Sequence, residues 1–165
     1  MRINYYFCFL FILISTISVA QKKQLWAKSF IGKKAPELVI KQWVNEQPET
    51  EGKFILIDFW GTWCGPCLKG IPDMNEYQKE FKDQLVVIGI SKEPIEKVKA
   101  FKKVQMEYFS GIDINGVLND TYEIQGIPHA VLIDPNGIVR WEGFPFLSGH
   151  QLTSKVIEDI IAKYK

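Results

Sequence analysis

Length, composition and charge describe one ordinary folded domain and exclude several functions. The chain has 165 residues, of which 47% are hydrophobic, and its 20 Lys and Arg residues nearly balance its 19 Asp and Glu residues. A formal net charge of +1 gives no reason to expect binding to DNA, RNA or an anionic membrane surface. The length suits one domain with one core, and the sequence contains no repeat, long linker or low-complexity tract.

The first twenty residues predict a signal peptide and therefore an extracytoplasmic protein. Arg2 gives a short basic start, residues 5–14 are nearly all apolar, and the small residues Ser18-Val-Ala20 precede the expected cleavage site. The apolar stretch is shorter than the roughly 20 residues that a membrane-spanning helix prefers, although an uncleaved anchor remains the alternative. We expect a signal peptide at residues 1–20 and one domain at residues 21–165, located in the periplasm or elsewhere outside the cytoplasm.

Taken in chain order, the apolar patterns predict alternating strands and helices. Runs rich in β-branched residues indicate strands, and apolar residues that recur every three or four positions indicate helices. The expected elements are a strand at 37–42, a polar turn at 45–52, a strand at 54–59, a helix that follows Cys64 and extends to Phe81, a strand at 85–90, a helix at 94–105, a short helix at 117–123, strands at 130–133 and 138–141 joined by a turn, and a final helix from Ser148. Pro72 should kink the helix that follows Cys64.

The order of these elements predicts an α/β fold. A strand, a helix and a strand in succession imply parallel neighbours with a right-handed crossover. Nearer the C-terminus, the Asn136-Gly137 step indicates an antiparallel hairpin. We therefore expect a mixed central sheet with helices on both faces.

The segment Trp60-Gly-Thr-Trp-Cys-Gly-Pro-Cys67 follows a buried strand and is the strongest functional motif. The turn residues Gly65 and Pro66 place Cys64 at the start of a helix, where unpaired N–H groups and the helix dipole favour a thiolate. Cys64 should therefore be the exposed, attacking sulfur. Cys67 lies one turn further on and should be covered, at a spacing that lets the two sulfurs form a disulfide.

Zinc binding and a purely structural disulfide are the competing interpretations of this pair. The chain has three cysteines, and Cys8 lies inside the predicted signal peptide, so the mature domain lacks a second pair for a tetrahedral zinc site. His129 and His150 do not have zinc-finger spacing, and His150 is expected at the surface. A disulfide that spans two intervening residues constrains the unfolded chain little, which favours a redox role.

These features together resemble the thioredoxin-fold proteins of the TlpA/ResA-like group, which are extracytoplasmic thiol-disulfide oxidoreductases. The resemblance spans roughly residues 32–163. Its carriers are the segment 59–67, Pro72, the Gly126-Ile-Pro128 step and the hairpin at 132–137. Residues 93–110 are similar to the extra helical insertion that separates this group from plain thioredoxin. The resemblance implies a thioredoxin-like fold and catalysis by the Cys64–Cys67 disulfide with no other cofactor.

The resemblance also implies that one of two acids transfers a proton. Asp58 matches the buried carboxylate of thioredoxin, which exchanges a proton with the inner cysteine. Glu93 occupies the place of an acid that other members of the group supply from the insertion, although it also suits a helix start before Pro94. A carboxylate inside an apolar strand is costly unless it is neutral or partnered, which favours a function for Asp58. Which of the two acids dominates stays open.

Residues around a predicted cis-proline loop are assigned to substrate binding. By resemblance, Pro128 matches the cis-proline that faces the active site in this fold, with Ile127 before it. Trp60 and Trp63 are expected to combine packing with substrate contact. His129 departs from the small hydroxyl residue that is common at its position, and we expect it at the rim of the site, with tuning of the thiolate as the alternative.

The sequence therefore predicts a thiol-disulfide oxidoreductase, and specifically a protein disulfide reductase. The expected substrates are disulfide-containing proteins, apocytochrome c among them, and the resemblance implies a membrane electron-transfer protein as donor to a monomeric enzyme. A copper chaperone that uses both cysteines and a histidine is one alternative. A peroxiredoxin-type peroxidase is the other, but it needs a Thr-x-x-Cys site, and Thr62 lies too close to Cys64 for that spacing.

Overall fold

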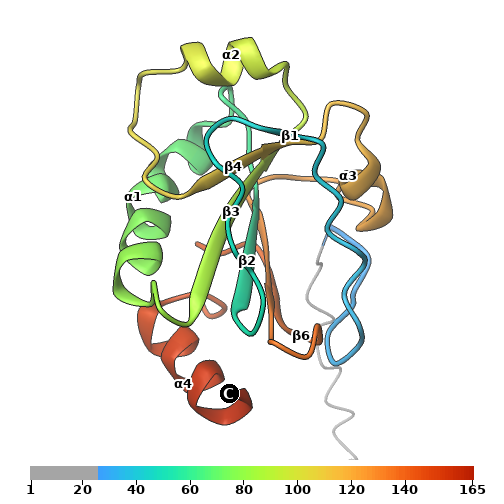
Figure 1. Ribbon diagram of the computed structural model, residues 1–165, viewed down its shortest axis with the longest axis vertical. Helices are drawn as coiled ribbons and strands as arrows, with labels where there is room; N and C mark the ends of the chain where they lie inside the picture. The colour runs from blue at the N-terminus through green and yellow to red at the C-terminus, as the bar shows by residue number, and fades with distance from the viewer. Residues whose placement is uncertain (1–25) are drawn as a thin grey trace, which may run out of the picture.

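The computed structural model describes residues 26–165, which form a six-stranded sheet with helices on both faces (Figure 1). The strands are β1 (Gln42–Trp43), β2 (Phe54–Phe59), β3 (Leu85–Ser91), β4 (Phe109–Ile112), β5 (His129–Ile133) and β6 (Val139–Gly143). The helices are α1 (Gly65–Glu80), α2 (Ile95–Ala100), α3 (Val117–Thr121) and α4 (Ser154–Tyr164). Among the described residues, no helix is both long and apolar enough to cross a membrane. The predicted signal peptide, with Cys8, lies outside the described residues.

The strand pairing confirms the predicted mixed sheet. The strand order is β1-β4-β3-β2-β5-β6. β3 is parallel to both β2 and β4, whereas β5 is antiparallel to β2 and forms a hairpin with β6. The hairpin turn contains Gly137 at a φ of 74°, which glycine adopts readily. The predicted parallel strand-helix-strand unit and the following hairpin are therefore both present.

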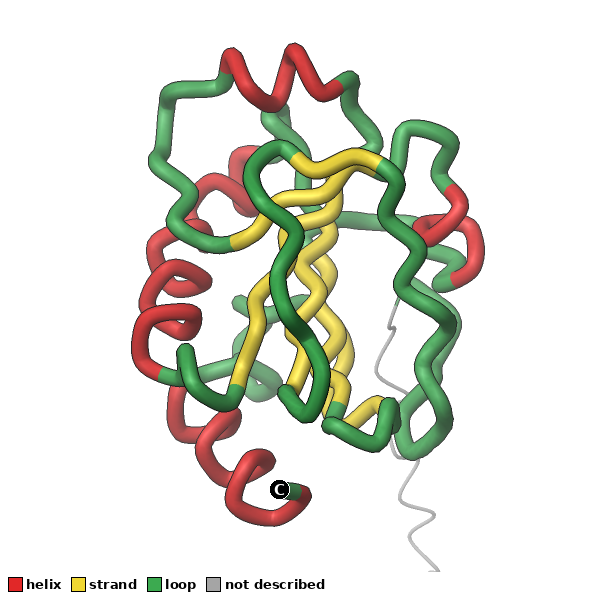
Figure 2. The backbone as a smooth tube through the Cα atoms, in the orientation of Figure 1, coloured by secondary structure: helices red, strands yellow, loops and turns green. Residues whose placement is uncertain are grey.

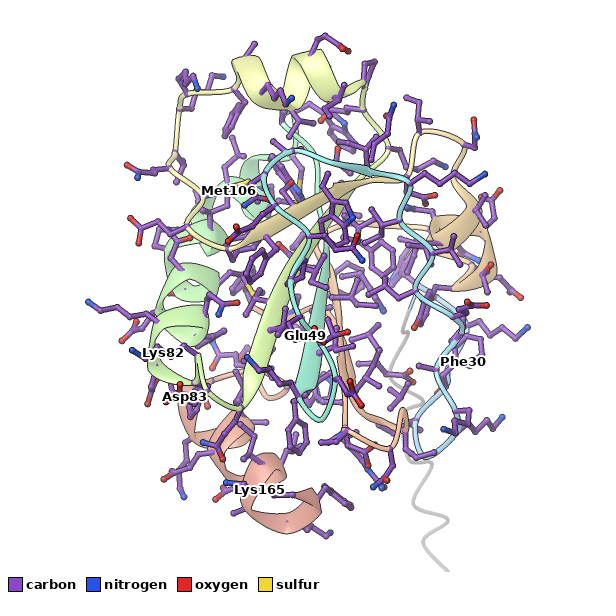
Figure 3. All side chains as sticks on the ribbon, in the orientation of Figure 1. Phe30, Glu49, Lys82, Asp83, Met106 and Lys165 are labelled. Atoms are coloured by element: carbon purple, nitrogen blue, oxygen red, sulfur yellow. A yellow bond between two sulfur atoms is a disulfide. The ribbon has the colours of Figure 1, made fainter. Side chains whose placement is uncertain are left out.

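Each face of the sheet has its own hydrophobic core. On one face, Ile71 of α1 and Ile157 of α4 belong to the same cluster as Leu56 of β2. On the other face, Leu118 of α3 packs in a cluster with Phe59 of β2. Figure 1 shows α1 and α4 on one side of the sheet and α3 on the other, and Figure 3 shows side chains filling both sides. This two-faced arrangement follows from the alternation of side chains along each strand.

Two strand predictions need correction. The predicted strand at 37–42 lies mostly outside the sheet, and the chain pairs with β4 at Gln42 and Trp43. Ile40 of this segment packs closely against Gly111, where an added Cβ atom would come within 2.8 Å of the Ile40 side chain. Strand β4 was not predicted, because its four residues include a serine and a glycine that weaken the strand pattern.

Two helices are shorter than predicted. The helix expected at 94–105 stops before Phe101, which has an extended backbone with φ −69° and ψ 124°. Figure 2 shows the chain continuing from there to β4 as a loop. The final helix starts later than Ser148, because the side chain of Thr153 accepts a hydrogen bond from the N–H of Val156 and caps the helix there.

Candidate active site

The turn between β2 and α1 carries the two cysteines. Cys64 is the N-cap residue of α1, and its Sγ accepts a hydrogen bond from the backbone N–H of Cys67 at 3.2 Å. The two residues are joined by a disulfide, with their Cα atoms 5.2 Å apart. Because a helix N-terminus stabilises negative charge and this N–H is directed at the sulfur, the geometry favours a thiolate on Cys64 after reduction.

The exposure of Cys64 differs from the prediction. Both cysteines are buried, with 3% of each residue exposed. Cys64 is covered because its side chain turns back over the first turn of α1, where its sulfur is bonded to Cys67. The exposed surface around the pair belongs to its neighbours, above all Trp63, which is 70% exposed. In the oxidised protein the two cysteine residues are therefore equally buried.

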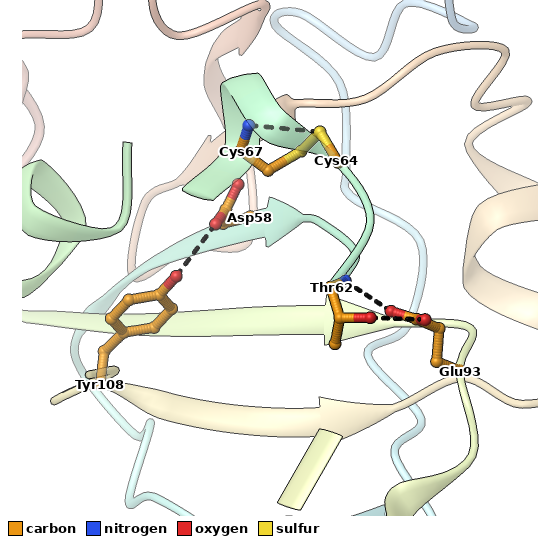
Figure 4. Close-up of a disulfide and its surroundings, with 6 residues drawn as sticks. All are labelled: Asp58, Thr62, Cys64, Cys67, Glu93 and Tyr108. Carbon is orange, nitrogen blue, oxygen red and sulfur yellow. Dashed lines mark hydrogen bonds between the residues drawn. A yellow bond between two sulfur atoms is a disulfide. The ribbon is translucent and has the colours of Figure 1, made fainter. Parts of the chain in front are cut away.

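Asp58 lies on β2 beneath the disulfide and points toward it (Figure 4). Its side chain is buried, and its Oδ2 atom accepts a hydrogen bond from the hydroxyl group of Tyr108 at 3.2 Å. Burial raises the pKa of Asp58 from 3.8 to about 7, although the hydrogen bond from Tyr108 opposes part of that shift. A carboxyl group that titrates near neutral pH can accept a proton and return it.

Tyr108 is a site residue that the sequence analysis missed. It lies 50 positions from Asp58 in the chain and precedes β4, a strand that was not predicted. The only local indication of its burial is an aromatic pair, Tyr108-Phe109, at the end of the insertion. Such a pair shows that a segment packs, but it does not show which strand it contacts.

Glu93 lies on the other side of the active-site turn from Asp58 (Figure 4). Its carboxylate accepts the backbone N–H of Thr62 at 2.5 Å and the Thr62 hydroxyl at 2.9 Å, and it pairs with Nζ of Lys97 at 2.5 Å. Burial disfavours the ionised form, but the hydrogen bonds from Lys97 and Thr62 outweigh it and lower the pKa of Glu93. Glu93 is therefore an ionised group with fixed partners at neutral pH.

A groove of about 210 Å³ lies beside the active-site turn. Its lining includes Trp63 and Glu93 from one side of the site and Gly126 and Ile127 from the loop before β5. The Ile127–Pro128 peptide bond is cis, as the resemblance implies. The fold thus brings the exposed tryptophan and the proline loop together on one concave surface.

His129 is buried rather than at the rim of the site, with 1% of its surface exposed. It lies opposite Phe59 in the β2–β5 register, so its ring is on the other face of the sheet from the neighbouring Asp58 side chain. The ring packs between Phe59 and Phe144, with centroid distances of 6.3 and 6.0 Å. Burial lowers the pKa of His129 from 6.5 to about 4, so the imidazole is neutral at pH 7.

The remaining predicted residues also contribute mainly packing. Trp60 borders the groove but is buried, and its ring meets Phe101 edge to face at 5.8 Å. His150, expected at the surface, is half-buried: it stacks on Trp141 at 4.8 Å, and its Nε2 lies 2.9 Å from the carbonyl oxygen of Glu142. Across the described part of the chain, no three His, Cys, Asp or Glu side chains gather into a metal-binding group.

Comparison with known proteins finds a family and relatives for this chain. The model of the AhpC/TSA family matches residues 31–142. The chain is 30% identical over 142 residues to the thiol-disulfide oxidoreductase ResA of Bacillus thuringiensis subsp. konkukian, an alignment that covers 82% of this chain and 79% of that protein.

Two solved structures show how widely this fold is used. A thiol-disulfide isomerase from Corynebacterium glutamicum has a TM-score of 0.65 and 20% identity, with 81% of this chain and 96% of that chain covered. A 2-Cys peroxiredoxin from Plasmodium vivax has a TM-score of 0.65 and 21% identity, with 82% and 96% covered. At these identities the likeness shows the fold alone.

The fold, a disulfide at the start of a helix and the ResA relative together define a redox enzyme of the thioredoxin superfamily. The chain belongs to the AhpC/TSA family, and like its ResA relative it is a thiol-disulfide oxidoreductase. Its substrates are accordingly proteins that contain disulfides. The predicted fold class and enzyme class are confirmed.

Proposed function

We propose that this enzyme reduces protein disulfides outside the cytoplasm. The observation that carries the proposal is one arrangement of three groups. Cys64 has an N–H donor directed at its sulfur, Cys67 lies one turn further along α1, and Asp58 is buried beneath them. This arrangement suits a nucleophile, a resolving thiol and a proton acceptor in one site.

The reaction begins with the reduced pair of cysteines. The Cys64 thiolate attacks one sulfur of a substrate disulfide, so a Cys64–substrate bond forms while the substrate S–S bond breaks and its other sulfur leaves as a thiolate. Cys67 then attacks Sγ of Cys64, which forms the Cys64–Cys67 disulfide and releases the second substrate thiolate. Two electrons have passed to the substrate, and the enzyme ends oxidised.

We infer that Asp58, rather than Glu93, accepts the proton that Cys67 loses. The pKa of Asp58, about 7, is close to neutral pH, so its carboxylate can take the proton from Cys67 and return it later. Glu93 is held by Thr62 and Lys97, and its lowered pKa makes it a poor proton acceptor. Its contacts suit a positioning residue that holds the turn before Cys64.

The groove beside the turn supports a binding site for the substrate segment that flanks its cysteine. Trp63 offers a largely exposed aromatic surface, and Ile127, which precedes the cis-proline Pro128, lines the groove from the loop before β5. A partly apolar groove of this kind suits an extended peptide segment better than a small polar molecule. Contact with these three residues would direct a substrate sulfur toward Cys64.

The sequence supports a proposal for the location and the partners. Residues 1–20 have the pattern of a signal peptide, which would deliver the domain at residues 21–165 to the periplasm or a similar compartment. A reductase in an oxidising compartment needs an electron donor to restore its two thiols, and the family resemblance implies a membrane electron-transfer protein in this role. Apocytochrome c is one candidate substrate within cytochrome c biogenesis, and the enzyme acts as a monomer.

Trapping of mixed disulfides tests this function. In the Cys67→Ala variant, Cys64 can attack but the resolving step is blocked, so substrate proteins stay covalently bound. Cells that express Cys67→Ala should contain mixed disulfides between the enzyme and substrate proteins, which dithiothreitol cleaves. Cells that express the matched Cys64→Ala variant should contain none. The full chain should also catalyse reduction of insulin disulfides. Equal adducts from both variants, or an unmodified chain that does not reduce insulin, would contradict the proposal.

A further inference from the structure

A tyrosine crosses one strand to reach the buried carboxyl group of β2. Tyr108 immediately precedes β4, and β3 lies between β4 and β2 in the sheet. The β3 residue in register with Asp58 is Gly89. The Tyr108 side chain therefore passes over the backbone of β3 at a glycine before its hydroxyl group meets Asp58 (Figure 4).

The glycine makes room for this crossing. A Cβ atom at position 89 would lie 3.0 Å from Cε2 of Tyr108, 3.0 Å from Nε1 of Trp60 and 3.1 Å from the methyl group of Met106. Real side chains rarely tolerate such close contacts, and Tyr108 is itself only 1% exposed, so its ring has little room to move. The missing side chain at Gly89 thus creates the space in which the tyrosine ring lies.

We propose that Tyr108 is a positioning residue for the proton acceptor: its hydroxyl group orients the Asp58 carboxyl group and stabilises the ionised form, and Gly89 permits the contact. The proposal rests on the proposed role of Asp58 in accepting the proton of Cys67. A carboxylate removed from water depends strongly on the few donors that remain. Here the hydrogen bond from Tyr108 supplies such a donor.

The surroundings of Asp58 leave few competing charges. Its in-register neighbours, Gly89 on β3 and Ala130 on β5, carry no ionisable group. The ionisable group in contact with it is the Tyr108 hydroxyl, the Cys64–Cys67 disulfide lies at the start of α1 above it, and Glu93 lies on the far side of the turn (Figure 4). The lysines of α2 and the following loop are exposed to solvent.

Replacement of Tyr108 by phenylalanine keeps the ring and removes the donor. We expect the pKa of Asp58 to rise by about one unit in Tyr108→Phe. The pH profile of the resolving step should shift upward by the same amount, so that its rate at pH 6 falls roughly tenfold while the rates converge above pH 9. Gly89→Ala should shift the profile in the same direction, because the added methyl group displaces the tyrosine ring.

Two measurements on the full chain test the proposal. The pKa of Asp58 is measured from the pH dependence of its ¹³C carboxyl resonance. The rate of the resolving step is measured in a single turnover with a disulfide-containing peptide, as the rate at which the peptide is released with its thiols reduced. The matched control is Tyr122→Phe, because Tyr122 is equally buried at 1% and its hydroxyl has no hydrogen-bond partner among the described residues. It also belongs to the core on the other face of the sheet.

A shift in Tyr108→Phe that is absent in Tyr122→Phe supports the positioning role. An unchanged Asp58 pKa in Tyr108→Phe, or an equal shift in Tyr122→Phe, overturns it. Asp58→Asn separates this inference from the function on which it rests. If Asp58→Asn releases peptide at the normal rate, Asp58 is not the proton acceptor, and the carboxyl resonance still decides whether Tyr108 controls its ionisation.

Discussion

Two buried side chains on opposite faces of the sheet should respond to pH in opposite directions. Burial raises the pKa of Asp58 to about 7 and lowers that of His129 to about 4. Between pH 4 and 6.5, Asp58 is therefore protonated in the folded protein but ionised in the unfolded chain. In the same range, His129 is neutral in the folded protein but protonated in the unfolded chain. The two contributions to the pH dependence of stability should largely cancel in this range.

Replacement of Asp58 by asparagine should remove one of these contributions. Because the folded-state pKa of Asp58 lies above its unfolded value, its contribution is fully present below pH 3.8 and is lost as pH rises through 7. Relative to the unmodified chain, Asp58→Asn should thus gain about 4 kcal/mol in free energy of unfolding between pH 4 and pH 8. Urea denaturation at both pH values measures this gain, and a difference independent of pH would contradict it.

Replacement of His129 by leucine should have the opposite effect. The folded-state pKa of His129 lies below its unfolded value, so its contribution is present above pH 6.5 and is lost as pH falls through 4. His129→Leu should therefore gain about 3 kcal/mol relative to the unmodified chain as the pH falls from 7 to 4. The same denaturation series tests this, and a stability difference between the two chains that is the same at pH 7 and pH 4 would contradict it.

At the scale of elements, the side chain of Asn45 extends the hydrogen-bond ladder between β1 and β4. The Asn45 side chain accepts the backbone N–H of Ser110 through Oδ1 at 2.9 Å and donates from Nδ2 to the carbonyl oxygen of Tyr108 at 3.1 Å. β1 pairs with β4 at two positions, and the amide of Asn45 satisfies the backbone groups just beyond them. Asn45 thus anchors the segment from which Tyr108 reaches Asp58.

Replacement of Asn45 by alanine should leave both backbone groups without their partner. We expect a loss of about 1–3 kcal/mol in the free energy of unfolding, and faster amide hydrogen exchange at Ser110. The exposed neighbour Glu46 provides the control, because Glu46→Ala should change stability by less than about 0.5 kcal/mol. Equal stability of the two variants would show that the Asn45 bridge contributes nothing.

At the scale of the whole molecule, the structure supports a reducing potential. The Gly65-Pro66 pair between the cysteines is that of thioredoxin, and His129, whose charge would favour a Cys64 thiolate, is neutral and on the other face of the sheet. A thiol with a low pKa raises the reduction potential, because its thiolate stabilises the reduced form of the protein. The stabilisation seen here comes from the start of α1 and one N–H group.

We therefore expect a potential closer to about −270 mV, the thioredoxin value, than to about −120 mV, the DsbA value. Equilibration of the protein with dithiothreitol or glutathione redox buffers measures it. His129→Leu should leave the value unchanged, since the ring it removes carries no charge at pH 7. A potential above about −180 mV would instead indicate an oxidase or isomerase.

Much of this molecule could be predicted because its central elements have strong local patterns. The apolar runs of β2 and β3 and the helical spacing after Cys64 each indicate one type of element within a few residues. The region between β3 and β5 was less predictable. Its helix ends early at Phe101, and β4 forms because it pairs with β3 and β1, which lie far from it in the sequence.

The sequence by itself placed two cysteines at the start of a helix and an acid on the preceding strand, and its resemblance to the TlpA/ResA-like group implied a proline loop beside them. Only the tertiary structure decided which partner each buried polar group has. It joined Asp58 to Tyr108 across Gly89, engaged Glu93 with Thr62, and enclosed His129 between two phenylalanine rings. The physical reason is that these contacts depend on strand register and on the space left by neighbouring side chains, and neither is encoded by a local pattern.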